Sequence, residues 1–250
     1  MRQLERMSVV FRHSAVVRIT HWINVLCLVV LLMSGMQIYN AHAALYWGKD
    51  SHFETPLFQL PARQTDDGEE TRAFPYWLTL PGYHDLATGR RWHLFFAWVF
   101  VLNGLVYLAS GIASGHFKRD LAPTRPQLRH IGRSFLEHLK LRFPKGEEAK
   151  QYNVLQKLAY AAVIFVLLPV IVLAGFNMSP ALNAAFPWLL DLFGGRQSAR
   201  TIHFVAANFI ALFFLVHVAM VIVSGLWNNL RSMITGRYQI EEMREAKRED

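Results

Sequence analysis

Four histidines lie inside long apolar stretches of this sequence, where an ionisable side chain is costly to bury. Two of them, His203 and His217, share the stretch from Arg200 to Trp227 and are 14 residues apart. On a helix this spacing is about 21 Å and brings both side chains within about 40° of one face. Neutral imidazole is a common axial ligand of haem iron, so a histidine near each end of one helix predicts two stacked cofactors.

The other two histidines, His21 and His93, stand near the first residues of two further apolar stretches. Antiparallel threading of the helices pairs His93 with His203 at one level and His21 with His217 at the other. Each pair could occupy both axial positions of one haem iron. Ligation by two histidines leaves no open position for oxygen, which favours electron transfer.

Small residues follow the same two histidines at helical spacing. Gly35 lies 14 residues after His21, and Gly104 and Gly111 lie 11 and 18 residues after His93. By the helical angle of about 100° per residue, each glycine falls close to the face of its histidine, at another level. We interpret these gaps in the side-chain layer as room for a cofactor. Close packing between membrane helices is the alternative.

Arginines precede three of the histidines by three residues, which places them on the same helix face. They are Arg18, Arg90 and Arg200, and Arg91 adjoins the second of them. An arginine at this position could bind a haem propionate with two parallel hydrogen bonds. Ordinary snorkelling of arginine at helix ends is the alternative.

The elements that position these residues are four apolar stretches of membrane-spanning length, read at residues 19–39, 93–113, 158–176 and 202–227. Of the 250 residues, 53% are hydrophobic, and a soluble domain of this size would not contain four such stretches. We therefore predict one domain, an all-α membrane protein with a four-helix transmembrane bundle. Pro169 is expected to kink the third helix, which carries no histidine.

The formal net charge is +8, and its distribution predicts the orientation. Lys and Arg number four in residues 1–18, nine in 114–152 and five in 228–250, but three in 40–89 and one in 177–199. By the positive-inside rule both termini and the loop 114–152 are cytoplasmic, while 40–89 and 177–199 lie on the opposite side of the membrane. Nucleic-acid binding is not needed to explain the charge.

Several other site types are excluded or disfavoured. Cys27 is the only cysteine, so one chain can form neither a disulfide nor a thiolate metal site, and without Cys-x-x-Cys-His any haem is b-type. Zinc is disfavoured because the paired histidines lie on separate apolar helices, without carboxylates to hydrogen-bond their rings. Four further histidines match neither level of the two pairs and are expected at the surface: His13, His42, His52 and His84.

The segments outside the spans have separate expectations. The long loop 40–89 carries apolar aromatic patches that predict either docking of a partner or packing over the helix ends. Apolar residues at helical spacing predict an interfacial helix over 128–143. The charged tail from residue 228 is expected to be helical.

The Arg-x-x-His-Trp sequence at Arg18–Trp22, the histidine that opens the second helix, and two histidines 14 apart in the fourth resemble one known family. It is the family of bacterial di-haem cytochrome b subunits, which includes those of nickel–iron hydrogenases, formate dehydrogenase-N and thiosulfate reductase, and bacterial cytochrome b561. The resemblance covers the four spans, whereas the loop 40–89 is longer than in compact members.

The resemblance implies a multi-pass protein of the bacterial inner membrane, whose loops 40–89 and 177–199 are periplasmic. It further implies a conduit for electrons between membrane quinone and a periplasmic redox partner, such as a molybdenum oxidoreductase. It places the outer haem on His93 and His203 and the inner haem on His21 and His217. A quinone near the inner haem could use Asn24 or Arg18. Two other functions stay open: a stand-alone superoxide:quinone oxidoreductase of the bacterial b561 type, which the long outer loop argues against, and a haem-free anchor.

Overall fold

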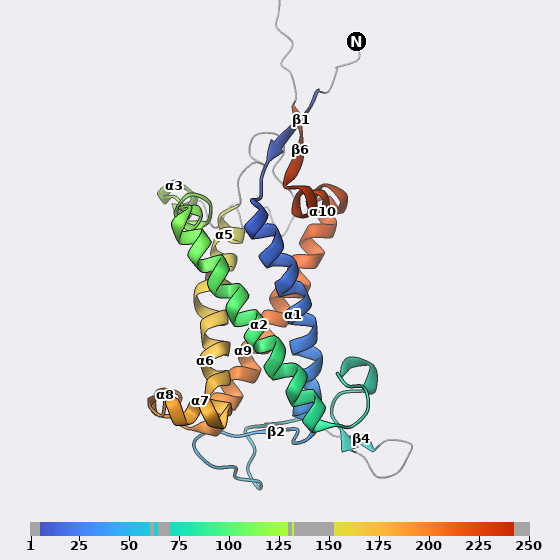
Figure 1. Cartoon of the computed structure of the whole chain (residues 1–250), viewed down its shortest axis with the longest axis vertical. Coiled ribbons are helices and arrows are strands. Elements are labelled where there is room, and N and C mark those ends of the chain that lie inside the picture. The colour runs from blue at the N-terminus through green and yellow to red at the C-terminus, as the bar shows by residue number, and fades with distance from the viewer. Residues whose placement is uncertain (1–5, 61–62, 65–70, 130–131, 133–152, 243–250) are drawn as a thin grey trace, which may run out of the picture. The chain divides into compact units, whose positions relative to one another are not determined.

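The structure is a computed structural model of the chain that describes residues 6–60, 63–64, 71–129, 132 and 153–242. Four helices are long and apolar enough to cross a membrane, which confirms the predicted all-α fold class. Between them lie short strands and helices (Figure 1). In chain order the elements are β1 (Arg6–Phe11), α1 (Ala15–Asn40), β2 (Ala44–Leu45), β3 (Phe58–Gln59), β4 (Arg63–Gln64), β5 (Thr71–Arg72), η1 (Tyr76–Leu78), α2 (Leu86–Ala113), η2 (Phe117–Leu121), α3 (Arg125–Arg129), α5 (Val154–Ala162), η4 (Val163–Leu167), α6 (Leu168–Met178), α7 (Pro180–Ala185), α8 (Trp188–Phe193), α9 (Arg196–Val223), α10 (Leu226–Thr235) and β6 (Arg237–Glu242).

The fourth long helix ends earlier than the sequence predicted. α9 stops at Val223, and Gly225 adopts a φ of 112° before α10 begins at Leu226. A φ in this range is open to glycine and strained for residues with a Cβ. The predicted end at Trp227 is therefore corrected: the apolar stretch continues, but the helix does not.

The third span, Val154–Met178, contains a wide turn where the sequence predicted a kink. Five residues, Val163–Leu167, form a π-helix immediately before α6 and its Pro169. Proline lacks the N–H that would bond the carbonyl four residues earlier, and its ring collides with that carbonyl. A π-turn is one way in which a helix accommodates this conflict.

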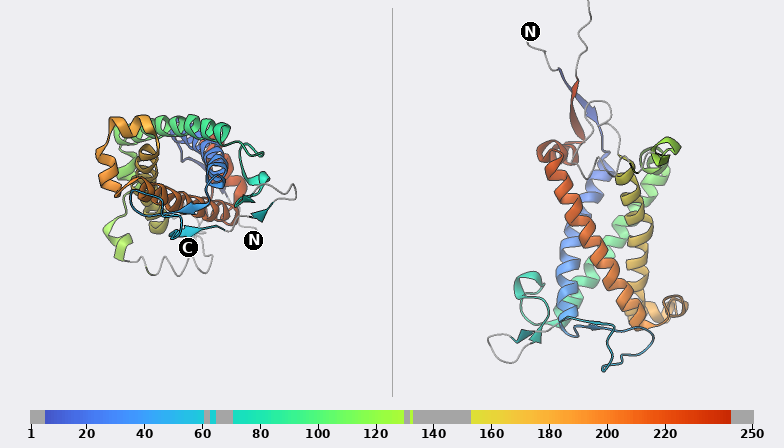
Figure 2. Two further views of the ribbon diagram at one scale, coloured as in Figure 1. Left: turned by 90° about the horizontal axis from the view of Figure 1, so that it is seen from below. Right: turned by 180° about the vertical axis from the view of Figure 1, so that it is seen from behind.

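The chain forms two compact units, and α1, α2 and α9 each contribute a part to both. The first unit comprises Met1–His21, Val106–Val163 and Leu215–Asp250. In it β1 pairs antiparallel with β6, from Arg6 opposite Glu242 to Phe11 opposite Arg237, and the two strands lie side by side in Figure 1 and in the right-hand view of Figure 2. The tail from residue 228 was expected to be helical; within its described part, which ends at residue 242, α10 is helical and the strand β6 follows it.

The second unit comprises Trp22–Leu105 and Ile164–Phe214. Its connecting segment (residues 41–85) includes the β2–β3 pair, whose Leu45 and the following Tyr46 are buried. The segment is bonded to the beginning of α9, because Thr201 donates to the Tyr46 carbonyl at 2.7 Å and Ser198 Oγ accepts from the Gly48 N–H at 2.8 Å. The connecting segment therefore packs on the helix that carries His203.

One buried arginine anchors the same segment to α1. Arg72 is 5% exposed and donates to the Gln37 side chain at 2.7 Å, to Thr79 Oγ1 at 3.2 Å and to the Gly82 carbonyl at 3.3 Å. Its guanidinium also lies over the Tyr76 ring, 4.2 Å from the ring centre, in a cation–π contact. These contacts attach the part of the segment that leads into α2.

One predicted element and one part of the long loop lie mostly or wholly outside the described residues. The interfacial helix expected over 128–143 falls mostly within 130–152, and only Arg125–Arg129 and residue 132 are described as helical there. The acidic stretch at 66–70 of the long loop is likewise not described.

We predict that Arg72→Met destabilises the second unit by about 2–4 kcal/mol, because hydrogen bonds to a charged donor are worth about 1.5–3 kcal/mol each. Thermal unfolding of the detergent-solubilised protein would measure the loss, and protease cleavage within residues 41–85 should increase. Lys49→Met is the matched control, since it removes one exposed positive charge from the same segment. Equal melting of the two variants would show that Arg72 does not anchor the segment.

Candidate functional site

The second unit brings His93 of α2 and His203 of α9 together. Their ring centres are 6.2 Å apart and the ring planes are inclined by 62°. Both side chains are half-buried, at positions where α2 and α9 have left their first turns. The structure thus brings together one of the two pairs that the sequence predicted.

A serine and a glycine of α1 hold the His93 ring. Ser34 is fully buried, and its hydroxyl lies 2.6 Å from the Val30 carbonyl and 3.0 Å from His93 Nδ1. Because a carbonyl can only accept, the hydroxyl donates to Val30 and accepts from the Nδ1–H of His93. A Cβ at the adjacent Gly35 would lie 3.5 Å from His93 Cε1, so the glycine lets the ring rest against the helix.

The His203 ring is held in the same manner by α6. Its Nδ1 is 2.8 Å from the Ile171 carbonyl, which requires that Nδ1 carries the proton. A Cβ at Gly175 would lie 3.3 Å from His203 Cε1, a tight contact, so the ring packs against this glycine. In both rings the proton is therefore on Nδ1, and Nε2 keeps the lone pair that binds a metal.

The first unit holds the second pair. His21 of α1 and His217 of α9 have ring centres 6.2 Å apart and planes inclined by 63°, close to the values of the other pair. Tyr160 of α5 lies beside His217, with ring centres 6.4 Å apart. Thus each unit contains one histidine pair, and α9 supplies a member to both.

The separation of the rings fits a shared metal ion. A bond from a divalent metal to an imidazole nitrogen is about 2.0 Å, and a ring nitrogen lies about 1.1 Å from the ring centre when ring bonds are about 1.33 Å. Two imidazoles on opposite sides of one ion therefore have centres about 6.2 Å apart. An edge-to-face aromatic contact gives similar separations. In the His93–His203 pair, the Nδ1 protons already bonded to Ser34 and Ile171 favour ligation through Nε2.

Two imidazoles suit a metal ion that a cofactor already supplies with most of its ligands. Among the residues described, no group of three or more His, Cys, Asp or Glu side chains could hold a bare ion. A structural or catalytic zinc site needs at least three protein ligands. Haem needs only axial ligands, because the porphyrin supplies the others, so two imidazoles suffice.

The four arginines of the sequence prediction have different surroundings. Arg18 donates to the Ile234 carbonyl of α10, and Arg200 donates to the His42 carbonyl at 2.6 Å. Arg90 and Arg91 are exposed, and Arg91 lines a shallow hollow with Thr88, Trp92 and Phe95. Binding of a propionate by any of the four stays a prediction.

The predicted small and polar residues also lie in distinct places. Nothing stands within 4 Å of the position of a Cβ on Gly104, whereas the Phe117 ring fills the space beside Gly111. Asn24 accepts a hydrogen bond of 2.7 Å from Asn103 and so joins α1 to α2. This pair satisfies polar groups within the apolar helices, and a quinone contact of Asn24 stays a prediction.

His13 was expected at the surface but is buried, with 8% of its area exposed. Burial, reinforced by the charges of Arg12 and Arg18 and by His21 and His116, lowers the pKa of His13 to about 4. The side chain is therefore neutral at physiological pH. His52 and His84 are exposed, as expected.

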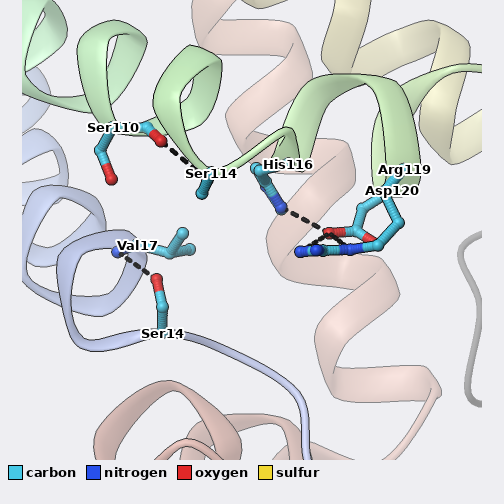
Figure 3. A network of polar contacts seen from close by, with 7 residues as sticks. All are labelled: Ser14, Val17, Ser110, Ser114, His116, Arg119 and Asp120. Carbon is cyan, nitrogen blue, oxygen red and sulfur yellow. Dashed lines mark hydrogen bonds and ion pairs between the residues drawn. The ribbon is translucent and has the colours of Figure 1, made fainter.

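His116, immediately before η2, belongs to a polar cluster of the first unit (Figure 3). Its Nδ1 lies 2.6 Å from Asp120, which Arg119 also contacts at 3.1 Å. Burial alone would raise the pKa of Asp120, but the hydrogen bonds from Arg119 and His116 hold it below its usual value. In the same view Ser14 Oγ accepts from the Val17 N–H and caps the beginning of α1.

Sequence reasoning missed the residues that orient the rings. Ser34 adjoins the predicted Gly35 and could have been found as a hydroxyl within an apolar helix. Gly175 lies in the third span, which was expected to provide only a wall. Ile171 acts through its carbonyl, so no property of its side chain indicates this role.

The chain was compared with known proteins. Residues 12–236 match the family described as prokaryotic cytochrome b561. The chain is 32% identical to the putative protein-methionine-sulfoxide reductase subunit YedZ1 of Azospira oryzae over 209 residues, which cover 84% of this chain and 89% of that protein. It is 24% identical to the probable Ni/Fe-hydrogenase B-type cytochrome subunit of Cupriavidus necator over 237 residues, 90% of this chain and 84% of that protein. No solved structure matches.

We predict that Ser34→Ala weakens binding of the haem expected at His93 by about 10–100-fold, the usual effect of losing a partner of a metal-bound histidine. The Nδ1–H would lose the hydroxyl as an acceptor, and the ring would be held less firmly. Transfer of haem to a competing haem-binding protein would measure the change. Ser34→Thr keeps the hydroxyl and should hold haem like the wild type, and equal transfer from Ser34→Ala would disprove the role.

Proposed function

Because the chain belongs to the prokaryotic cytochrome b561 family, which holds haem b, we propose that it binds two haems and carries electrons across the membrane between quinone and a periplasmic redox partner. The observation that carries the proposal is the presence of two histidine pairs with nearly the same ring geometry. Each has ring centres 6.2 Å apart, and the two pairs belong to different units of the structure.

His93 and His203 would hold one haem, and His21 and His217 the other. Haem iron with two imidazole ligands exchanges single electrons and has no open position for oxygen. Ser34 and Ile171 fix the first pair of rings through their Nδ1 protons, which keeps each Nε2 lone pair available and limits the movement of the ligands when charge changes.

The two levels are needed because electrons must cross the membrane. α9 carries one ligand of each pair, so the histidine spacing on this single helix would set the distance between the two haems. Side chains between the levels are largely apolar, which suits a conductor of electrons that excludes ions.

The bias of Lys and Arg supports the orientation, with the termini in the cytoplasm and the connecting segment in the periplasm. Both relatives are named as subunits, one of a protein-methionine-sulfoxide reductase and one of a Ni/Fe-hydrogenase. We propose that this chain likewise serves a partner, which would approach the connecting segment because that segment is bonded directly to the beginning of α9.

Reduced-minus-oxidised spectra of the purified protein, together with a haem-to-protein ratio, test the function. The expected result is a b-type spectrum, two haems per chain and reduction of both haems by added quinol. A ratio of one, or haems that quinol does not reduce, would contradict the proposal.

We predict that His203→Ala and His217→Ala each lose one haem, and not the same one. His203→Ala should remove the haem at His93, and His217→Ala the haem at His21. Redox titration identifies the haem that remains, because the two should titrate at different potentials. His84→Ala is the control, since this histidine is exposed and belongs to neither pair. Loss of the same component from both variants would disprove the pairing.

A further inference from the structure

A buried lysine stands near the His21–His217 pair. Lys157 lies in the first turn of α5, within the first unit, and is 4% exposed. Its ammonium contacts two neutral oxygens, the Ala122 carbonyl and the Gln127 side chain, each at 3.4 Å. Ammonium–oxygen hydrogen bonds are usually shorter than this, so both contacts are weak.

The location is unfavourable for a cation. Burial of an ammonium is costly unless a charge or several good hydrogen bonds compensate for it. The first turn of a helix adds to this cost, because the helix dipole places partial positive charge there. Within the part of the chain that the structure describes, no carboxylate forms an ion pair with Lys157. An anion at this place would remove the conflict.

The same face of α5 reaches a histidine of the pair. Tyr160 follows Lys157 by three residues and so shares its face, one turn or about 4.5 Å further along the helix. Its ring is the one that lies beside His217. Lys157 is therefore close to the level of the pair and nearer the end of the span, where the charged edge of a haem would avoid the apolar interior.

We propose that Lys157 binds a propionate carboxylate of the haem held by His21 and His217. The inference rests on the proposed function, in that this pair must hold a haem. A carboxylate is the charged group that haem b itself carries, and a charge-assisted hydrogen bond from a buried ammonium would satisfy both charges. Arg18, one turn before His21, would be placed to bind the second propionate.

The test is a redox titration of the purified wild type and of Lys157→Met, Lys157→Gln and Lys157→Arg. Loss of the ammonium leaves the carboxylate charge uncompensated, which favours ferric iron. In the Met and Gln variants we expect a shift of about tenfold toward the ferric form, or about 59 mV lower for one electron. The shift should affect only the haem that His217→Ala removes. Lys157→Arg keeps the charge and should restore the wild-type potential.

Two controls separate this role from simple packing. Gln127→Ala removes a contact of the ammonium but leaves its charge, so the potentials should not change. Lys118→Met removes an exposed lysine of the same unit and should also leave them unchanged. If Lys157→Met does not fold, the haem-to-protein ratio of Lys157→Gln and Lys157→Arg decides, and retention of the haem by Arg with its loss from Gln supports the proposal.

Two results would overturn the inference: unchanged potentials and ratios in Lys157→Met and Lys157→Gln, or the same shift in Gln127→Ala as in Lys157→Gln. Absence of haem from the wild type would instead refute the proposed function. The two failures are therefore distinguishable.

Discussion

Everything at the His93–His203 pair depends on one requirement, that a neutral imidazole within an apolar helix must find an acceptor for its N–H. The acceptors come from other helices, a serine hydroxyl of α1 and a backbone carbonyl of α6. Each ring also rests on a glycine of the helix that provides the acceptor. The packing of the helices and the orientation of the two rings consequently depend on the same contacts, since moving α1 or α6 would turn a ring.

This requirement explains why some of the structure could be predicted and some could not. Histidines in apolar stretches are unusual enough to be seen in the sequence, and their levels follow from helix geometry, so both pairs could be assigned. The acceptor for His203 is the carbonyl of Ile171, which any residue could supply. Gly35 was noticed for its spacing from His21, yet the ring that it accommodates is His93, because only the packed structure shows which helix is adjacent.

The ends of the helices show the same limit. Apolar composition continues beyond Val223, but the backbone turns at Gly225, and hydropathy does not report backbone conformation. His13 matches neither level of the paired histidines and was expected at the surface, whereas the fold covers it. Lys157 looks like an ordinary interfacial lysine in the sequence, and its burial became apparent only with the packing of α5.

The pairing of β1 with β6 joins a strand that precedes α1 to a strand that follows α9 and α10, with Arg6 opposite Glu242. A ribosome makes β1 before these helices and β6 after them, and domains generally form as the chain emerges. The amino-terminal strand must therefore wait, without its partner, until every membrane helix has been translated. The β1–β6 pairing therefore forms late in biogenesis, and its formation shows that all the membrane helices between the two strands have been synthesised.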